Sequence, residues 1–276
     1  MRETVFYLIS KEMLRRGYSP RTIQTYSFCI KQFLKKYNKE PRKITKKDVK
    51  DYLDGLAEKN KAGSTINLNL NAIKFLFQEV MHRNIFIKLK YSKRPKNLPT
   101  VLTKEEVKRL FDAIENKKHK LMVQLMYSAG LRVSELINLR IRDLELDKSY
   151  GWVRKGKGSK DRLFIIAENL NKNLQEFIEK NSLNYNDFLF KGNKRQHISK
   201  ETINAIIKIA AKKAKIEKNV HAHTLRHSFA THLIENGYDL SNVQTLLGHN
   251  SSETTRIYVH MANPKLINVK SPLDEL

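Results

Sequence analysis

Residues 150–166 read Tyr-Gly-Trp-Val-Arg-Lys-Gly-Lys-Gly-Ser-Lys-Asp-Arg-Leu-Phe-Ile-Ile, and they carry the one clear β-strand signal of the chain. Trp152-Val153-Arg154 and Leu163-Phe164-Ile165-Ile166 are short runs rich in β-branched and aromatic residues, and Gly156-Lys157-Gly158 lies between them. Two such runs on either side of a glycine turn predict a β-hairpin. The segments around it have helical periodicity, so we expect a mainly α protein with a small β-hairpin or sheet.

Helices are predicted on both sides of this hairpin. Before it, Thr103 and Glu106 form a capping box that begins one helix, and a second helix ends at Gly130. After it, Ser199 and Ser241 are the expected N-caps of two further helices. The ranges predicted for this part of the chain are about 103–116, 118–129, 168–181, 200–214, 224–235, 242–247 and 252–260.

The first hundred residues predict four helices. Apolar residues recur at helical spacing from Val5 to Met13, and Gly17 is a natural stop. Ser19 followed by Pro20 begins a second helix, because serine caps the free backbone N–H groups and proline tolerates the first helical position. The expected N-caps of the third and fourth helices are Thr45 and Ser64.

A basic segment separates the two parts. Residues 88–100 contain Pro95 and Pro99 and no acidic residue. Because proline removes backbone hydrogen-bond donors, this composition predicts an extended linker. Its basic residues, which we expect to follow a DNA backbone, are Lys88, Lys90, Lys93, Arg94 and Lys96. We therefore predict a domain at 1–87, a linker at 88–100 and a second domain at 101–276.

Charge indicates a polyanionic partner. The 276 residues include 53 Lys and Arg against 28 Asp and Glu, a net charge of +25. Residues 1–100 hold 23 basic and 8 acidic residues, so they carry +15 of that total. This excess favours nucleic acid as the partner. The single cysteine, Cys29, excludes a disulfide framework and a multi-cysteine metal site. No apolar run approaches the roughly 20 residues of a membrane span, so we expect a cytoplasmic, nucleoid-associated protein.

Histidines concentrate near the end of the chain, where six of the nine lie between residues 221 and 260. His223 and His227 are four residues apart, a spacing that zinc sites use. However, Thr224 stands where a metalloprotease motif has glutamate, and Arg226 between the two histidines would repel a cation. We therefore predict no metal.

The second candidate motif is a nucleotide-binding phosphate loop (P-loop). Gly151, Gly156 and Lys157 match its glycines and lysine, but Gly158 occupies the position of the Mg²⁺-binding serine or threonine. The flanking segments also predict strand–turn–strand rather than strand–loop–helix, so we reject a nucleotide site. A lysine held in a basic glycine turn remains, and it could reach a neighbouring phosphate.

Six polar residues form a set suited to a phosphodiester under attack. Arginine forks match the non-bridging oxygens, and their charge stabilises a pentavalent transition state. A tyrosine is a competent nucleophile only when deprotonated, and at pH 7 only roughly 0.1% of a tyrosine with a pKa of about 10 is ionised. A base or a strong positive field must therefore lie beside it. The set is Arg132, Lys157, His223, Arg226, His249 and Tyr258.

These residues fall in four blocks of sequence. The blocks are Ser128-Ala-Gly-Leu-Arg132-Val-Ser-Glu-Leu136, Gly156-Lys-Gly-Ser-Lys-Asp-Arg162, His223-Thr-Leu-Arg-His-Ser-Phe-Ala-Thr-His232, and Leu246-Leu-Gly-His249 with Thr254-Thr-Arg-Ile-Tyr258-Val-His260. In this order and spacing the chain resembles the tyrosine recombinase (phage-integrase) family, most closely its Xer branch, with a weaker likeness to archaeal Xer-like recombinases in the tail. The likeness covers the whole chain.

The resemblance implies a two-domain C-shaped clamp, with a helical, SAM-like core-binding domain and a tyrosine-recombinase catalytic domain. It implies that Tyr258 attacks the scissile phosphate, Arg132 and Arg226 clamp that phosphate, and Lys157 protonates the departing 5′ oxygen. His223 would assist proton transfer from the tyrosine and His249 would hydrogen-bond the phosphate. No cofactor is implied.

The implied reaction is site-specific recombination of double-stranded DNA through a 3′-phosphotyrosyl intermediate and a Holliday junction. A homo-tetramer on paired sites would carry it out, with or without a partner recombinase or accessory protein. Dimer resolution of chromosomes or plasmids and integration or excision of a mobile element both remain open. Two other functions also stay open at this point: DNA relaxation of the type IB topoisomerase kind, and a non-catalytic DNA-binding factor.

Overall fold

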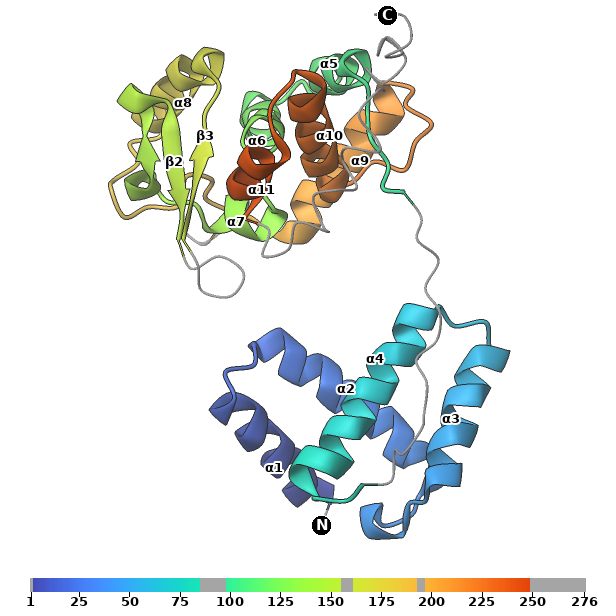
Figure 1. Ribbon diagram of the computed structural model, residues 1–276. Coiled ribbons are helices and arrows are strands. Elements are labelled where there is room, and N and C mark those ends of the chain that lie inside the picture. Colours follow the sequence, from blue (N-terminus) through green and yellow to red (C-terminus); the bar gives the residue numbers. More distant parts are fainter. Residues whose placement is uncertain (1, 85–97, 155–160, 193–196, 249–276) are drawn as a thin grey trace, which may run out of the picture. The chain divides into compact units, whose positions relative to one another are not determined.

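The computed structural model describes residues 2–84, 98–154, 161–192 and 197–248 (Figure 1). The chain divides into two compact units, Met1–Lys96 and Asn97–Leu276. Each unit has a hydrophobic core of its own. Among the described residues, no helix is both long enough and apolar enough to cross a bilayer.

The first unit is helical throughout its described part. Its α-helices are α1 (Arg2–Arg15), α2 (Pro20–Tyr37), α3 (Lys46–Glu58) and α4 (Gly63–Lys74), and α4 continues as a π-helical segment, η2 (Phe75–Val80). A short 3-10 turn, η1 (Pro41–Lys43), precedes α3. The four predicted helices are thus confirmed, and Ile30, Phe33, Leu70, Ile73 and Phe77 from α2, α4 and η2 are buried in the core between them.

Two of the three predicted caps in this unit are confirmed. The Ser19 hydroxyl accepts a hydrogen bond from the Thr22 backbone N–H, and Thr45 forms a reciprocal capping box with Asp48. The expected cap at Ser64 is wrong: Ser64 is already the second residue of α4, and the N-cap of that helix, Ala62, makes no side-chain capping bond.

The second unit is mainly helical, with a small antiparallel sheet at one side of it next to α8 (Figure 1). Its strands are β1 (Leu144–Glu145), β2 (Tyr150–Val153) and β3 (Arg162–Ile165), in the order β1-β2-β3. The predicted hairpin is confirmed by the register of β2 on β3, in which Tyr150 pairs with Ile165 and Val153 with Arg162. The helices are α5 (Lys104–Asp112), α6 (Lys117–Ser128), α7 (Val133–Asn138), α8 (Glu168–Lys180), α9 (Lys200–Lys213), α10 (Ala222–Glu235) and α11 (Leu240–Leu247), with 3-10 turns η3 (Ile141–Asp143) and η4 (Leu146–Lys148).

Three details of this unit differ from the sequence expectations. The helix that begins at the Thr103 capping box ends at Asp112, four residues earlier than predicted. The short helix α7 and strand β1 were not predicted. The cap expected at Ser241 is wrong, because α11 already begins at Leu240. The helix predicted at 252–260 lies outside the described residues.

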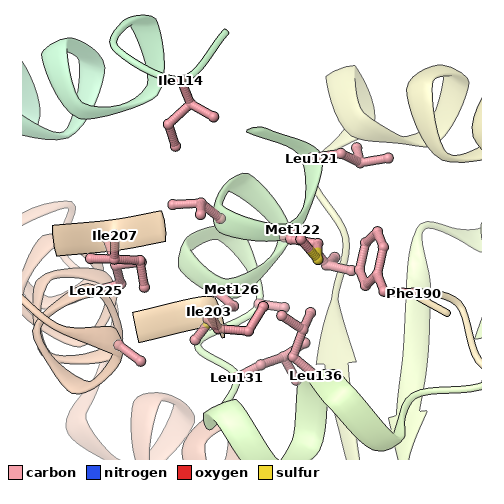
Figure 2. Close-up of a cluster of buried hydrophobic side chains, with 14 of the residues drawn as sticks. Ile114, Leu121, Met122, Met126, Leu131, Leu136, Phe190, Ile203, Ile207 and Leu225 are labelled. Carbon is pink, nitrogen blue, oxygen red and sulfur yellow. The ribbon is translucent and has the colours of Figure 1, made fainter. Parts of the chain in front are cut away.

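Helix α6 lies in the middle of this unit and contacts α8, α9 and α10. Figure 2 shows Met126 of α6 beside Ile203 of α9, and Met122 of α6 beside Phe190. Leu131 and Leu136 are fully buried in the same cluster, shortly after α6 ends. Because these two side chains are buried on either side of it, the residue between them at the start of α7, Arg132, has a fixed position.

Candidate active site

Three arginines from distant parts of the second unit meet at one buried carboxylate, Glu135. Nη1 of Arg132 lies 2.6 Å from Oε1 of Glu135, and Nη2 of Arg162 lies 2.6 Å from Oε2. Nη1 of Arg226 lies 3.7 Å from the same Oε2. The Glu135 side chain is only 5% exposed. We call these four residues the arginine–glutamate cluster.

The first arginine is held by the start of α7. Arg132 is the N-cap residue of this helix, and its backbone N–H donates to Oε2 of Glu135 at 2.9 Å. Just before it, Gly130 has a positive φ of 55°, and a Cβ there would lie 2.5 Å from Cδ1 of Phe229. Glycine is therefore required, because it permits both the left-handed turn and the close approach of α10. This turn brings Arg132 close to Arg226.

Arg226 is the most buried of the three arginines. It lies on α10 and is 3% exposed. Its Nη1 donates to the carbonyl of Gly130 and its Nη2 to the carbonyl of Leu247. Arg226 therefore ties the end of α6 and the end of α11 to α10. Leu247 is two residues before His249 in the sequence, which lies outside the described residues.

Arg162 is the first residue of β3. Its Nη1 donates to the carbonyl of Leu246, and its side chain fills the space beside Gly248, where a Cβ would lie 2.7 Å from Cδ of Arg162. Gly248 has a positive φ of 61° and ends α11. The predicted hairpin is thereby joined to both α7 and α11 through one guanidinium group.

The carboxylate of Glu135 stays ionised in this cluster. Burial alone would raise its pKa, but the charge of Arg162, the hydrogen bond from the Arg132 N–H and the charge of Arg226 outweigh burial and lower the pKa of Glu135. Three guanidinium groups against one carboxylate leave an excess of two positive charges. Of the three arginines, Arg132 is the most accessible, with 20% of its side chain exposed. The cluster is thus suited to an incoming anion such as a phosphodiester.

Histidines line the first turns of α10 next to the cluster. His223 lies one helical turn before Arg226, and its ring centroid is 6.4 Å from that of His227. Desolvation, followed by the charges of His221, Arg226 and Arg132, lowers the pKa of His223. Desolvation and the neighbouring positive charges also lower the pKa of His227, to about 4. Both imidazoles are therefore neutral at pH 7, and His223 can accept a proton.

Three of the six predicted catalytic residues are described, and the structure places all three near one another: Arg132, His223 and Arg226. The other predicted catalytic residues, Lys157, His249 and Tyr258, lie outside the described residues, as do Lys88, Lys90, Lys93, Arg94 and Lys96. Within the described part of the chain, no group of three or more His, Cys, Asp or Glu could hold a metal ion.

Two members of the cluster, Glu135 and Arg162, were not singled out from the sequence. Glu135 follows Arg132 by three residues, the spacing of a capping box, and it could have been found by that signal. Arg162 occupies an inward-facing position of β3, two residues before the buried Phe164. A charged residue at an inward position of an otherwise apolar strand was the available signal for it.

Comparison with known proteins gives matches along nearly the whole chain. Residues 100–264 match the phage integrase family, and residues 7–87 match the phage integrase N-terminal SAM-like domain. Tyrosine recombinase XerA of Pyrococcus horikoshii is 36% identical over 253 residues, which cover 91% of this chain and 86% of the relative. Tyrosine recombinase XerD of Oceanobacillus iheyensis is 34% identical and covers 92% of both chains.

Solved structures of tyrosine recombinases also resemble this chain over most of its length. A crystal structure of XerA recombinase is 36% identical, with a TM-score of 0.56 and coverage of 97% of this chain and 96% of that one. XerH site-specific recombinase bound to a palindromic difH substrate is 26% identical, with a TM-score of 0.75 and coverage of 94% and 82%. A lambda integrase dimer on a core site shares the fold, with a TM-score of 0.76, 19% identity and 98% coverage of both chains.

Proposed function

The chain belongs to the phage integrase family as a site-specific tyrosine recombinase of the Xer type, and from this premise we propose that Tyr258, with Arg132 and Arg226 of the arginine–glutamate cluster, cuts and rejoins double-stranded DNA. The Tyr258 oxygen attacks the scissile phosphorus, and the bond from phosphorus to the 5′ oxygen breaks. The products are a 3′-phosphotyrosyl link and a free 5′-hydroxyl. Attack by a 5′-hydroxyl from the other duplex then reverses the step and releases the tyrosine.

The observation that carries this proposal is the meeting of Arg132 and Arg226 at Glu135. Arg132 and Arg226 would contact the non-bridging oxygens of the scissile phosphate, where their charge stabilises the transition state. Glu135 takes no part in the chemistry. It compensates part of the arginine charge and fixes where the guanidinium groups lie.

Two residues would transfer protons, and a third would donate a hydrogen bond to the phosphate. A neutral His223 accepts the proton of the Tyr258 hydroxyl, directly or through water. Lys157, which lies between β2 and β3 in the sequence, protonates the leaving 5′ oxygen. His249 donates a hydrogen bond to the phosphate. The covalent link conserves the energy of the broken bond, so strand exchange would need neither a nucleotide nor a metal.

The assembly and the domain roles complete the proposal. Residues 1–87 form the core-binding domain, 101–276 the catalytic domain, and the basic residues of 88–100 follow the DNA backbone between them. DNA attraction is supported by the net charge of +25. Four copies on two sites would exchange strands twice through a Holliday junction, with or without a partner recombinase. The reaction would take place on the nucleoid in the cytoplasm, as dimer resolution or as integration and excision of a mobile element.

The experiment begins with selection of a binding site from random DNA by the purified protein. A supercoiled plasmid carrying two copies of that site in direct repeat is then the substrate. The proposal expects two smaller circles, and none with Tyr258→Phe. Relaxed plasmid without recombinant circles would assign a topoisomerase activity instead, and binding without cleavage would assign a non-catalytic DNA-binding factor.

A further inference from the structure

Helix α10 holds the backbone of the segment that begins the second unit. The N–H of Leu102 donates to Oγ of Ser228 at 2.9 Å, and the carbonyl of Leu102 lies 3.0 Å from Nε2 of His232. Leu102 is the first buried residue of the described part of this unit, with 0% exposure. Both of its backbone polar groups are thus bonded to side chains of the helix that also carries His223 and Arg226.

The other ring nitrogen of His232 connects α10 to α6. Nδ1 of His232 lies 2.7 Å from the hydroxyl oxygen of Tyr127, which is on the last turn of α6. A carbonyl only accepts, so Nε2 carries the proton that is donated to Leu102 and Nδ1 accepts from the tyrosine O–H. Burial lowers the pKa of His232, which agrees with this neutral tautomer. Every polar atom of the His232 ring is satisfied in this arrangement.

This second connection lies close to the first one at the arginine–glutamate cluster. Tyr127 is three residues before Gly130, whose carbonyl accepts from Arg226. Arg226 and His232 are six residues apart on α10, a rise of about 9 Å. Helices α6 and α10 pack against each other (Figure 1). Polar bonds from two points along α10, Arg226 and His232, therefore join this helix to the end of α6. Two directional bonds at different points along α10 restrict its rotation and its sliding against α6 beyond the restriction that apolar packing gives.

We propose that Tyr127, Ser228 and His232 form a positioning network for the recombination reaction: they set the register of α10 against α6 and the Leu102 segment, and so determine where Arg226 meets the scissile phosphate. None of the three touches the reacting atoms in this scheme. Their effect passes through Arg226, so the inference rests on the proposed function. It predicts that removing a member of the network slows cleavage more than the accompanying loss of fold stability would explain.

The test is a double-mutant cycle on cleavage of saturating DNA in a single turnover. Tyr127→Phe removes one hydroxyl and keeps the ring, which packs on Phe111. The matched control is Tyr52→Phe, which removes a buried tyrosine hydroxyl bonded to Asn69 in the first unit. Tyr127→Phe is expected to slow cleavage about 10-fold with unchanged DNA affinity, because small misplacements at a reacting centre are costly. Tyr52→Phe is expected to leave the rate unchanged.

The second arm repeats the change in an Arg226→Lys background. If the network acts through Arg226, Tyr127→Phe lowers the cleavage rate of the Arg226→Lys variant by less than about 2-fold. Ser228→Ala, which removes the bond to the Leu102 N–H, is expected to give the same pattern and carries the test if Tyr127→Phe unfolds. An equal loss in both backgrounds, or a lower Tm with an unchanged rate, would overturn the inference. Arg226→Lys that cleaves as fast as the parent would instead overturn the proposed function.

Discussion

Glu135 accepts a 2.6 Å hydrogen bond from Arg162, and this buried pair joins the first turn of α7 to the first residue of β3. The two residues are 27 positions apart in the sequence. Through this pair, the sequence block that contains Arg132 is joined to the first residue of β3. The same carboxylate also meets Arg226 from α10, so one acidic side chain organises three basic ones.

Replacing Glu135 by glutamine is therefore expected to destabilise the protein strongly. The amide keeps the shape but removes the negative charge, which leaves buried guanidinium groups uncompensated. Breaking a buried ion pair from one side costs about 3–5 kcal/mol, and the free energy of unfolding measured with denaturant should fall by that amount. Glu12→Gln is the control, because Glu12 pairs with Arg15 and Arg16 at the surface. Similar small changes in both variants would show that the cluster does not depend on its carboxylate.

A second expectation concerns pH and the first unit. The Lys39 ammonium, opposed by desolvation and aided by hydrogen bonds from Thr45, lowers the pKa of Asp48 to about 2. A carboxylate with a depressed pKa stabilises the fold above its unfolded pKa of about 3.9, and this contribution is lost as the pH falls through 2. Asp48→Ala should therefore lower the Tm at pH 6, and its difference from the parent should shrink between pH 5 and pH 2. A difference that stays constant over this range would contradict the capping role.

The elements found from the sequence are those whose cause is local. The caps at Ser19, Thr45 and Thr103 follow from side chains that bond backbone groups three residues away, and the hairpin follows from two apolar runs around glycines. Helix α7 has six residues and β1 has two, too short for any periodic signal. These short elements are stabilised by tertiary contacts, the pairing of β1 in the sheet and the burial of Leu136. Such contacts cannot be recognised from the sequence alone.

The site was predictable only in part for the same reason. Arg132 stands out because it follows Ala129-Gly130-Leu131, and Arg226 because it lies one helical turn after His223. Arg162 bonds the carbonyl of Leu246, which lies 84 residues away, and that proximity exists only in the folded chain. The network of Tyr127, Ser228 and His232 likewise joins three segments that no spacing rule connects.

Cleavage is expected to persist in the presence of a chelator. The phosphate would be met by arginines and a lysine, so EDTA should leave the rate of covalent adduct formation unchanged when ionic strength is matched. The measurement is the yield of protein–DNA adduct on a gel with and without EDTA. Loss of adduct in EDTA and its return with Mg²⁺ would mean that a metal ion stabilises the transition state.

Lys157 and the leaving group give a chemical test of the general acid. Lys157→Ala should slow cleavage about 10²–10⁴-fold, the usual contribution of a general acid. A 5′-bridging sulfur leaves readily as thiolate without a proton, so such a substrate should restore most of the rate to this variant. It should not rescue Tyr258→Phe, which lacks the nucleophile. Equal losses on oxygen and sulfur substrates would show that Lys157 only positions the DNA.

The most direct measurement identifies the residue that becomes joined to DNA. A substrate nicked near the scissile phosphate traps the covalent complex, and proteolysis followed by mass spectrometry locates the attached nucleotide. We expect the nucleotide on the peptide that contains Tyr258, linked through its 3′-phosphate, with no adduct from Tyr258→Phe. A 5′-phosphate link, or attachment to any other residue, would contradict the proposal that Tyr258 is the nucleophile.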